Sequence, residues 1–223
     1  SITRHYMECI HLGENRTILN QFVAELRDVD IQKDRLRFRR NIERIGEIMA
    51  YEISQRLNYQ TKSVQTPLGV AEMELPSDQV VLATVLRAGL PFHQGFLNYF
   101  DRAENAFVSA SRRYTDVSHF VIDSKYLASP SIEGKTLLIV DPMLATGSSL
   151  EVAYKALLKR GTPAHVHVAA VVASPEGVEY AMKALPDDRT TLWVAALDKG
   201  LNEHTYIVPG LGDAGDLAFG EKE

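Results

Sequence analysis

The stretch Thr136 to Leu150, TLLIVDPMLATGSSL, decides the fold. It begins with the apolar and β-branched run TLLIV, a continuous pattern that is typical of a strand covered on both faces. Asp141 follows this run, and small residues from Ala145 to Ser149 lead into the start of a helix. In open α/β sheets, ligands bind beyond the carboxyl ends of the strands. The stretch therefore predicts a parallel strand with a ligand site at its end.

Similar apolar runs recur along the chain. With the first run they predict five strands, at Val80 to Leu86, Ala106 to Ser111, Thr136 to Asp141, His165 to Ala173 and Thr191 to Leu197. An apolar stripe that starts at Leu150 and stops before Gly161 predicts one helix between strands. Ser174 as N-cap and Pro175 in the first turn predict another. Alternating strands and helices predict an α/β fold with a central, mostly parallel sheet.

Basic residues crowd together from Lys33 to Arg44, in KDRLRFRRNIER, although the chain has a formal net charge of -5. Apolar residues recur at steps of three and four from Phe38 to Leu57, which predicts one amphipathic helix whose charges face water. A basic helix could lie along a phosphate backbone, but the net acidity argues against a protein that coats nucleic acid. We expect no nucleic-acid role for this helix.

Two segments interrupt the alternation of strands and helices. Thr66 to Leu75, TPLGVAEMEL, predicts a hairpin or projecting arm ahead of the sheet, suited to a contact between subunits. Arg112 to Ser131 carries little periodicity. Long irregular stretches in a compact domain are commonly disordered or functional, so we expect a mobile lid here.

The composition is that of an ordinary globular chain, with 223 residues, 45% hydrophobic and 24% charged. No apolar run approaches the roughly 20 residues that span a bilayer, and the first residues lack the layout of a signal peptide. Cys9 is the single cysteine, which excludes an intrachain disulfide and fits a reducing compartment. These features predict a cytoplasmic protein with one domain.

The turn from Ala145 to Ser149 has the chemistry of an anion site. It offers hydroxyl groups, and its backbone N-H groups lie at the positive end of the following helix. Gly147 permits unusual dihedral angles and a close approach of the backbone. An ordinary turn with Thr146 or Ser148 as N-cap is the alternative for the tripeptide alone. The segment has neither the Gly-Lys-Ser/Thr of a P-loop nor the G-x-G-x-x-G of a dinucleotide fold.

The longer string VDPMLATGSS, from Val140 to Ser149, closely resembles a signature of the uracil phosphoribosyltransferases, a branch of the type I phosphoribosyltransferase family. In that family the signature binds 5-phosphoribosyl 1-diphosphate (PRPP). VLRAGLP, at 85–91, is similar to the family's diphosphate-binding loop, and LDKGLNEHTYIVPGLGDAGDLAFG, at 197–220, to its uracil-binding segment. The motifs follow the family's order from about Val80 onward. One departure is Ser148, where the family commonly has a second glycine.

The resemblance implies a type I phosphoribosyltransferase fold in a single domain, 1–223. N-terminal helices and the arm would occupy about 15–76, the PRPP-binding core about 77–198, and a uracil-binding hood about 199–223. It also implies a non-proline cis peptide in the loop around Arg87.

The resemblance implies a set of site residues. Those for PRPP are Arg87, Arg112, Asp141, Pro142, Met143, Leu144, Ala145, Thr146, Gly147, Ser148, Ser149 and Asp213. Those for uracil are Ile207, Gly212, Asp213 and Ala214. Arg87, Asp141 and Asp213 would carry the catalysis. Arg113 is an open alternative to Arg112, and the residues alone leave a structural salt bridge as the alternative for Arg87.

The implied reaction joins uracil to PRPP and gives UMP and diphosphate, as in pyrimidine salvage. Mg²⁺ is the expected cofactor, and because it usually binds to substrate phosphates, we expect no dedicated metal site in the protein. His165 and His167 face the same way on one predicted strand but lack a third ligand, so we expect edge or surface residues rather than a zinc site. No residue stands out as a general base.

Other functions fit parts of the same sequence. The same fold could serve as a PRPP-sensing, RNA-binding regulator of pyrimidine genes, with the basic helix from Lys33 as the RNA contact. A transferase for another base and a non-catalytic interaction module are further alternatives. The segment YIVPGLGDAGD, at 206–216, favours the uracil enzyme. The resemblance also implies a homodimer or larger homo-oligomer, and it leaves open whether GTP is an activator.

Overall fold

The centre of the molecule is a sheet of eight strands. The computed structural model describes the backbone of residues 7–114, 120–123 and 126–223, and it describes no side chain from 111 to 125. The strands of the sheet are β1 (Glu8–His11), β4 (Val80–Leu86), β5 (Glu104–Ser109), β8 (Leu127–Ala128), β9 (Thr136–Val140), β10 (Met143–Leu144), β11 (His165–Ala173) and β12 (Thr190–Leu197). Their order is β1-β12-β11-β9-β4-β5-β8, with β10 paired to β11. Only β8 runs antiparallel to its neighbour. The mostly parallel sheet confirms the predicted α/β class.

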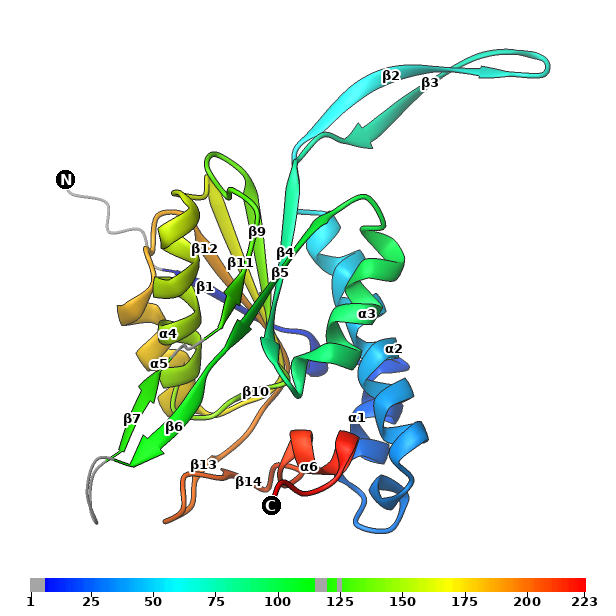
Figure 1. Ribbon diagram of the computed structural model, residues 1–223. Helices are drawn as coiled ribbons and strands as arrows, with labels where there is room; N and C mark the ends of the chain where they lie inside the picture. The colour runs from blue at the N-terminus through cyan, green and yellow to red at the C-terminus, as the bar shows by residue number, and fades with distance from the viewer. Residues whose placement is uncertain (1–6, 115–119, 124–125) are drawn as a thin grey trace, which may run out of the picture.

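Helices cover both faces of this sheet. The helices in the described part of the chain are α1 (Leu19–Arg27), α2 (Arg35–Ser54), α3 (Gly89–Tyr99), α4 (Ser148–Leu157), α5 (Pro175–Ala184) and α6 (Ala214–Phe219), with short 3-10 turns at Leu12–Glu14, Ile31–Lys33 and Leu158–Arg160. Figure 1 shows α1, α2 and α3 on one face and α4 and α5 on the other. Two hydrophobic cores lie on the two faces of the sheet, one under α1, α2 and α3 and the other under α4 and α5. Leu138 and Val140 belong to the first core, whereas Leu137 and Ile139 belong to the second. Strand β9 is therefore apolar throughout because both of its faces are buried.

The predicted strands are all present: β4 and β11 have the predicted ends, and the ends of the other three differ by one or two residues. Strand β5 begins at Glu104 rather than Ala106 and ends at Ser109. Strand β9 ends at Val140, so Asp141 lies just beyond it. The predicted N-cap is also present, because the Ser174 hydroxyl accepts a hydrogen bond from the Gly177 N-H at 2.9 Å.

The predicted amphipathic helix is α2. Its apolar face, which includes Phe38, Ile45 and Ile53, is fully buried against the sheet and the neighbouring helices. Helix α3 packs closely on α2, because a Cβ at Gly95 would lie 2.1 Å from the Glu43 carbonyl oxygen. This contact fixes α3 and, with it, the loop before Gly89.

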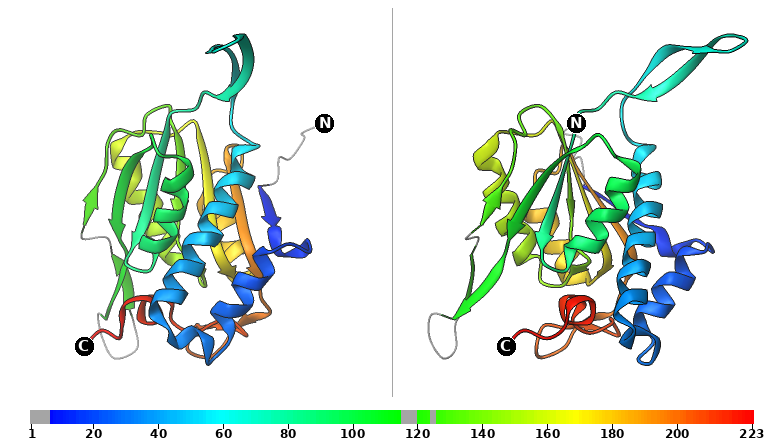
Figure 2. Two further views of the ribbon diagram at one scale, coloured as in Figure 1. Left: turned by 90° about the vertical axis from the view of Figure 1, so that its right-hand side faces the viewer. Right: turned by 45° about the vertical axis from the view of Figure 1, so that its right-hand side comes forward.

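The predicted arm is longer than the sequence indicated. Strands β2 (Tyr59–Thr66) and β3 (Gly69–Pro76) pair antiparallel over their whole length. The segment Thr66 to Leu75 covers only the turn and the second strand, so the prediction missed the first one. Figures 1 and 2 show the hairpin standing away from the rest of the molecule. Most of its side chains are exposed, and an exposed strand carries no apolar alternation.

The predicted lid falls partly outside the described residues, which exclude 115–119 and 124–125. Its described parts are not irregular as expected. Strands β6 (Ser111–Tyr114) and β7 (Phe120–Asp123) form an antiparallel ribbon, and β8 joins the sheet. The motion of this segment stays a prediction.

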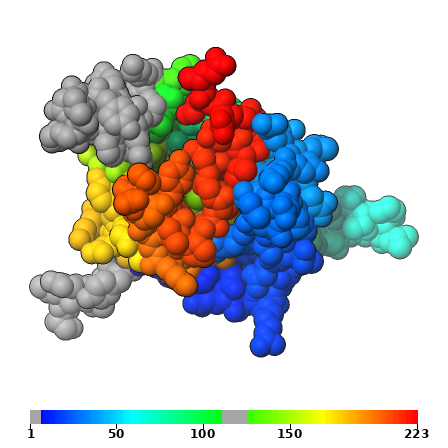
Figure 3. Space-filling view, turned by 90° about the horizontal axis from the view of Figure 1, so that it is seen from below, coloured from blue at the N-terminus to red at the C-terminus, as the bar shows by residue number. Residues whose placement is uncertain are grey.

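The C-terminal segment covers the carboxyl edge of the sheet. Strands β13 (Gly200–Leu201) and β14 (Ile207–Val208) pair antiparallel, and α6 follows. Figure 3 shows this segment, in orange and red, lying against the N-terminal helices. Among the described residues, no helix has both the length and the hydropathy needed to cross a membrane.

Candidate active site

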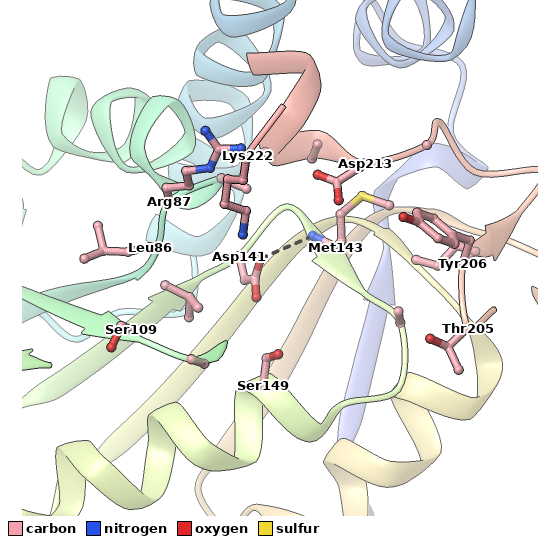
Figure 4. Close-up of a pocket in the computed structure, with 18 of the residues that line it drawn as sticks. Leu86, Arg87, Ser109, Asp141, Met143, Ser149, Thr205, Tyr206, Asp213 and Lys222 are labelled. Atoms are coloured by element: carbon pink, nitrogen blue, oxygen red, sulfur yellow. Dashed lines mark hydrogen bonds between the residues drawn. The ribbon is translucent and has the colours of Figure 1, made fainter. Parts of the chain in front are cut away.

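A pocket of about 600 Å³ lies at the carboxyl edge of the sheet, beneath the C-terminal segment. Three parts of the chain line it (Figure 4). The first comprises Val85, Leu86, Arg87 and Ala88 with Ser109 and Ala110, the second Asp141, Met143, Ala145 and Ser149, and the third His204, Thr205, Tyr206, Ile207, Gly212, Asp213, Ala214, Gly215 and Lys222. All three motifs singled out in the sequence therefore contribute to one pocket.

Asp141 lies on the floor of this pocket, directly after β9. Its Oδ1 accepts a long hydrogen bond of 3.5 Å from the Met143 N-H, which Figure 4 marks. Burial raises the pKa of the Asp141 carboxyl to about 7, and the hydrogen bond from Met143 lowers it only in part. A poorly solvated carboxylate favours partners that donate hydrogen bonds, such as sugar hydroxyls, or a cation.

The small-residue turn is held in shape from both sides. Gly147 has φ +86, and a Cβ there would lie 2.8 Å from the Tyr180 ring, so both the dihedral angle and the packing require glycine. The Thr146 hydroxyl accepts from the Ser148 N-H at 3.3 Å. The Ser174 hydroxyl donates to the Ala145 carbonyl at 2.5 Å. The N-H groups in the first turn of α4 lack intrahelical partners and lie beside the pocket residue Ser149.

Several residues expected to bind PRPP do not line the pocket: Pro142, Leu144, Thr146, Gly147 and Ser148. The Pro142 carbonyl accepts hydrogen bonds from the N-H groups of Val171 and Val172, at 2.9 and 3.0 Å. The Leu144 side chain is buried in the core under α4 and α5. The side chains of Arg112 and Arg113 lie outside the described residues, although their backbone is part of β6.

Arg87 lines the pocket and also forms an ion pair. The Leu86–Arg87 peptide is cis, as the family resemblance implies. The Arg87 Nη2 donates to Asp216 Oδ1 at 2.9 Å and to the Gly220 carbonyl at 2.8 Å. The Nε atom is buried and has no hydrogen-bond partner among the described residues. The two interpretations of Arg87, salt bridge and ligand group, are therefore compatible.

The segment from β14 to the start of α6 brings Ile207, Gly212, Asp213 and Ala214 into the pocket wall. Gly212 has φ +101, which favours glycine. Asp213 caps α6, because its Oδ1 accepts from the Asp216 N-H at 2.9 Å. The backbone N-H and C=O groups of such a loop can recognise the polar edge of a planar base.

Side chains of α1 and α2 and the turn between them support this loop from behind. Arg27 Nη1 donates to the Gly210 carbonyl at 2.9 Å, and Gln32 Nε2 donates to the Leu211 carbonyl at 3.0 Å. Arg39 Nη1 donates to the Ala218 carbonyl at 2.8 Å. The N-terminal helices therefore position the C-terminal part of the site.

Sequence reasoning missed Lys222. Figure 4 shows its side chain reaching into the pocket toward Asp141. A lysine near the end of a chain has no feature that separates it from an ordinary solvated residue. The sequence also offered no signal for Asp216 as the partner of Arg87, because the two are 129 positions apart.

The histidines differ from expectation in one respect. His165 is exposed, but His167 is buried and its Nδ1 accepts a hydrogen bond from Trp193 Nε1 at 3.1 Å. Burial, followed by the nearby His165, lowers the pKa of His167 to about 4. His167 is therefore a neutral core residue rather than the expected edge or surface residue.

Comparison with known proteins gives the family. The family model described as uracil phosphoribosyltransferase matches residues 14–221. A uracil phosphoribosyltransferase of Porphyromonas gingivalis is 63% identical over 216 residues, 97% of this chain and 100% of that protein. One of Pyrococcus furiosus is 38% identical over 215 residues, 95% of this chain and 90% of that protein.

Among solved structures, the AQ2163 protein from Aquifex aeolicus is similar, with a TM-score of 0.83 and 28% identity. The similarity covers 95% of this chain and 98% of that one. Nearly the whole chain therefore matches the family in sequence, and its motifs meet in one pocket. This protein belongs to the uracil phosphoribosyltransferase family.

Proposed function

We propose that this protein joins uracil to PRPP and releases UMP and diphosphate. One observation carries the proposal: the diphosphate loop, the phosphate turn and the base segment line a single pocket. A pocket that takes two substrates needs groups for a phosphate, a diphosphate and a base close together. The three segments supply groups of these kinds.

The proposed PRPP contacts follow from the chemistry of each group. The turn from Ala145 to Ser149 binds the 5-phosphate through backbone N-H groups and hydroxyls at the start of α4. Asp141 accepts hydrogen bonds from the ribose hydroxyls. Arg87 holds the diphosphate through its planar guanidinium, and Arg112 is the second arginine assigned to PRPP.

Uracil lies against the loop formed by Ile207, Gly212, Asp213 and Ala214. Backbone donors and acceptors of this loop recognise O2, N3-H and O4. Cytosine reverses donor and acceptor at two of these positions, so its binding would leave buried polar groups unpaired. Such mismatches can discriminate by about ten-thousand-fold or more.

In the reaction, N1 of uracil attacks C1 of the ribose while the bond from C1 to diphosphate breaks, with inversion at C1. The bonding electrons leave with the diphosphate, and the N1 proton passes to water or to the departing diphosphate. Arg87 stabilises the negative charge of the leaving group, and Asp141 keeps the ribose in line with the base. We assign no residue as general base.

Mg²⁺ fits this pocket as a cation carried by PRPP. The carboxylates of Asp141 and Asp213 both line it, and oxygen ligands are those that Mg²⁺ prefers. The ion supplies charge neutralisation at the diphosphate when bound. We also propose a homodimer or larger homo-oligomer, a cytoplasmic site of action and GTP as a candidate activator, to be tested by adding it to the same assay.

The test is UMP formation from uracil and PRPP, with and without EDTA, beside Asp141→Asn. We expect robust synthesis with uracil, none with cytosine or guanine, and a loss of at least about a hundredfold in the variant. Asp188→Asn, at an exposed aspartate that does not line the pocket, is the matched control and should keep full activity.

The alternative functions give different results in this assay. PRPP binding without turnover on any base would contradict the proposal and favour the regulator of pyrimidine genes. Salt-dependent RNA binding that is lost on neutralising the basic face of α2 would then support that function.

A further inference from the structure

Within the described part of the chain, Arg87 forms hydrogen bonds through one nitrogen only. Its Nη2 donates to Asp216 and to the Gly220 carbonyl, and the Phe219 ring lies 6.0 Å from the guanidinium carbon. All three partners belong to α6 or to the residue that follows it. These contacts therefore connect Arg87 of the diphosphate loop to the C-terminal segment, which also forms the base site.

Asp216 makes this contact from outside the substrate pocket. It is not among the residues that line that pocket, whereas Arg87 and Asp213 are. Asp216 instead lines a neighbouring hollow together with Gln32 and Arg35. Asp216 therefore does not occupy the place of a substrate in the substrate pocket.

The other donors of Arg87 have no partner in the part of the chain that the structure describes. Nε is buried without a hydrogen bond, and the two hydrogen bonds of the guanidinium both come from Nη2. A buried N-H without an acceptor is unfavourable, and Nε stays unpaired while the guanidinium keeps this position. Nη1 carries two further N-H donors, and their directions are fixed once the planar guanidinium is held in place.

We propose that Asp216 is a positioning residue for diphosphate binding. It fixes the guanidinium plane of Arg87 through Nη2 and thereby leaves the two N-H groups of Nη1 as donors for the diphosphate of PRPP. This inference rests on the proposed function. Because Asp213 of the base site caps the same helix, α6 connects the diphosphate group to the base loop.

The opposite role would be competition, in which Asp216 withholds Arg87 from the substrate. The two roles differ in sign. Removing a competitor would strengthen PRPP binding. Removing a positioning group weakens it, because a free Arg87 side chain must be ordered when PRPP binds, and the lost conformational entropy opposes binding. The position of Asp216 outside the pocket favours positioning.

A double-mutant cycle with Asp216→Asn and Arg87→Gln tests the inference. The readouts are the Kd of PRPP and of diphosphate by calorimetry, and the KM values of PRPP and uracil. The Arg87 and Asp216 side chains are 30% and 33% exposed, so the ion pair is partly shielded from water. We therefore expect Asp216→Asn to weaken PRPP and diphosphate binding about tenfold, with a smaller change in the KM of uracil. In the Arg87→Gln background it should have no further effect.

Two controls separate this role from a general loss of structure. Asp188→Asn repeats the chemical change at an exposed Asp-Arg pair and should alter neither affinity. Asp216→Ser is measured in parallel, so that the cycle closes even if the asparagine variant does not fold. Thermal melting of each variant confirms the native state.

Each result has a defined meaning. Unchanged or tighter PRPP binding by Asp216→Asn would overturn the inference, as would an equal loss in both Arg87 backgrounds, which indicates a packing role. Failure of the wild-type protein to bind PRPP or form UMP would instead overturn the proposed function.

Discussion

The buried carboxyl of Asp141 lowers the stability of the folded protein when it is ionised. Its carboxyl lies where β9 meets the pocket floor, and burial raises its pKa to about 7. One hydrogen bond, from Met143 at 3.5 Å, is too long to compensate for the lost water. An ionised carboxylate here destabilises the protein until a ligand supplies donors or a cation. Residues of this kind are typical of binding sites, where stability and function oppose each other.

This cost predicts the stability of Asp141→Asn. The native carboxyl keeps its proton up to about pH 7, whereas the unfolded chain releases it near pH 4. The free energy of unfolding of the wild type therefore falls as the pH rises from about 4 to about 7. The variant has no carboxyl at this position, so its free energy of unfolding does not fall for this reason. We expect the variant to gain on the order of 4 kcal/mol at about pH 8, from a pKa difference of about three units, and almost nothing at about pH 4.

Urea unfolding of both proteins across this pH range measures the difference. Asp188→Asn, at an exposed position, should follow the wild type. An Asp141→Asn protein that is less stable than the wild type at about pH 8 would show that the carboxylate is well paired in the native state.

At the level of elements, the sequence predicted what is buried on both sides. Strands β4, β9 and β11 are almost fully buried, and their continuous apolar runs predicted them correctly. The exposed strand β2 and the short edge strand β1 were missed, because partly exposed strands lack such runs. The local pattern of apolar residues indicates which strands are buried, so strands that are largely exposed could not be predicted from it.

The candidate site divides in the same way. Motifs within one segment, such as the turn around Gly147, could be recognised from the sequence because their residues are neighbours. The contacts of Arg87 with Asp216 and of Arg27 with Gly210 join distant parts of the chain. Side-chain pairing over such distances depends on how the elements pack, and a single sequence does not contain it.

The contact between α1 and the base loop leads to a prediction at this scale. Arg27 bonds both carboxylate oxygens of Asp198, at 2.6 and 2.9 Å, and the Gly210 carbonyl at 2.9 Å. Burial alone would raise the pKa of Asp198, but the hydrogen bonds from Arg27 and the Gly210 N-H leave it lowered. Arg27→Lys keeps the charge but loses the fork that makes these bonds.

We expect Arg27→Lys to raise the KM of uracil about tenfold and to leave the KM of PRPP within about twofold, because the loop it supports contacts the base. Steady-state kinetics with each substrate varied measures the split. Arg40→Lys, at an exposed arginine of α2, is the control. A larger effect on PRPP than on uracil would mean that Arg27 supports the whole pocket rather than its base side.

At the scale of the whole molecule, the arm has no partner within the described part of its own chain. Strands β2 and β3 pair only with each other, and a lone two-stranded hairpin is marginally stable in water. Its apolar side chains are largely exposed, with Leu68 at 99% and Val70 at 63%. An extended hairpin with exposed apolar groups is suited to pack on a second copy of the chain.

If the arm packs on a second subunit, negative charges placed on its exposed apolar residues should weaken the association of the subunits. Leu68→Asp combined with Val70→Asp should shift the protein toward the monomer, because burying two carboxylates in an interface is strongly unfavourable. The melting temperature of the isolated chain should change little, since both side chains are exposed. Light scattering over a concentration series measures the mass, and Ile18→Asp, at an exposed apolar residue outside the arm, is the control. An unchanged mass for the double variant, with the control also unchanged, would mean that the subunits associate through another surface and that the arm serves a different contact.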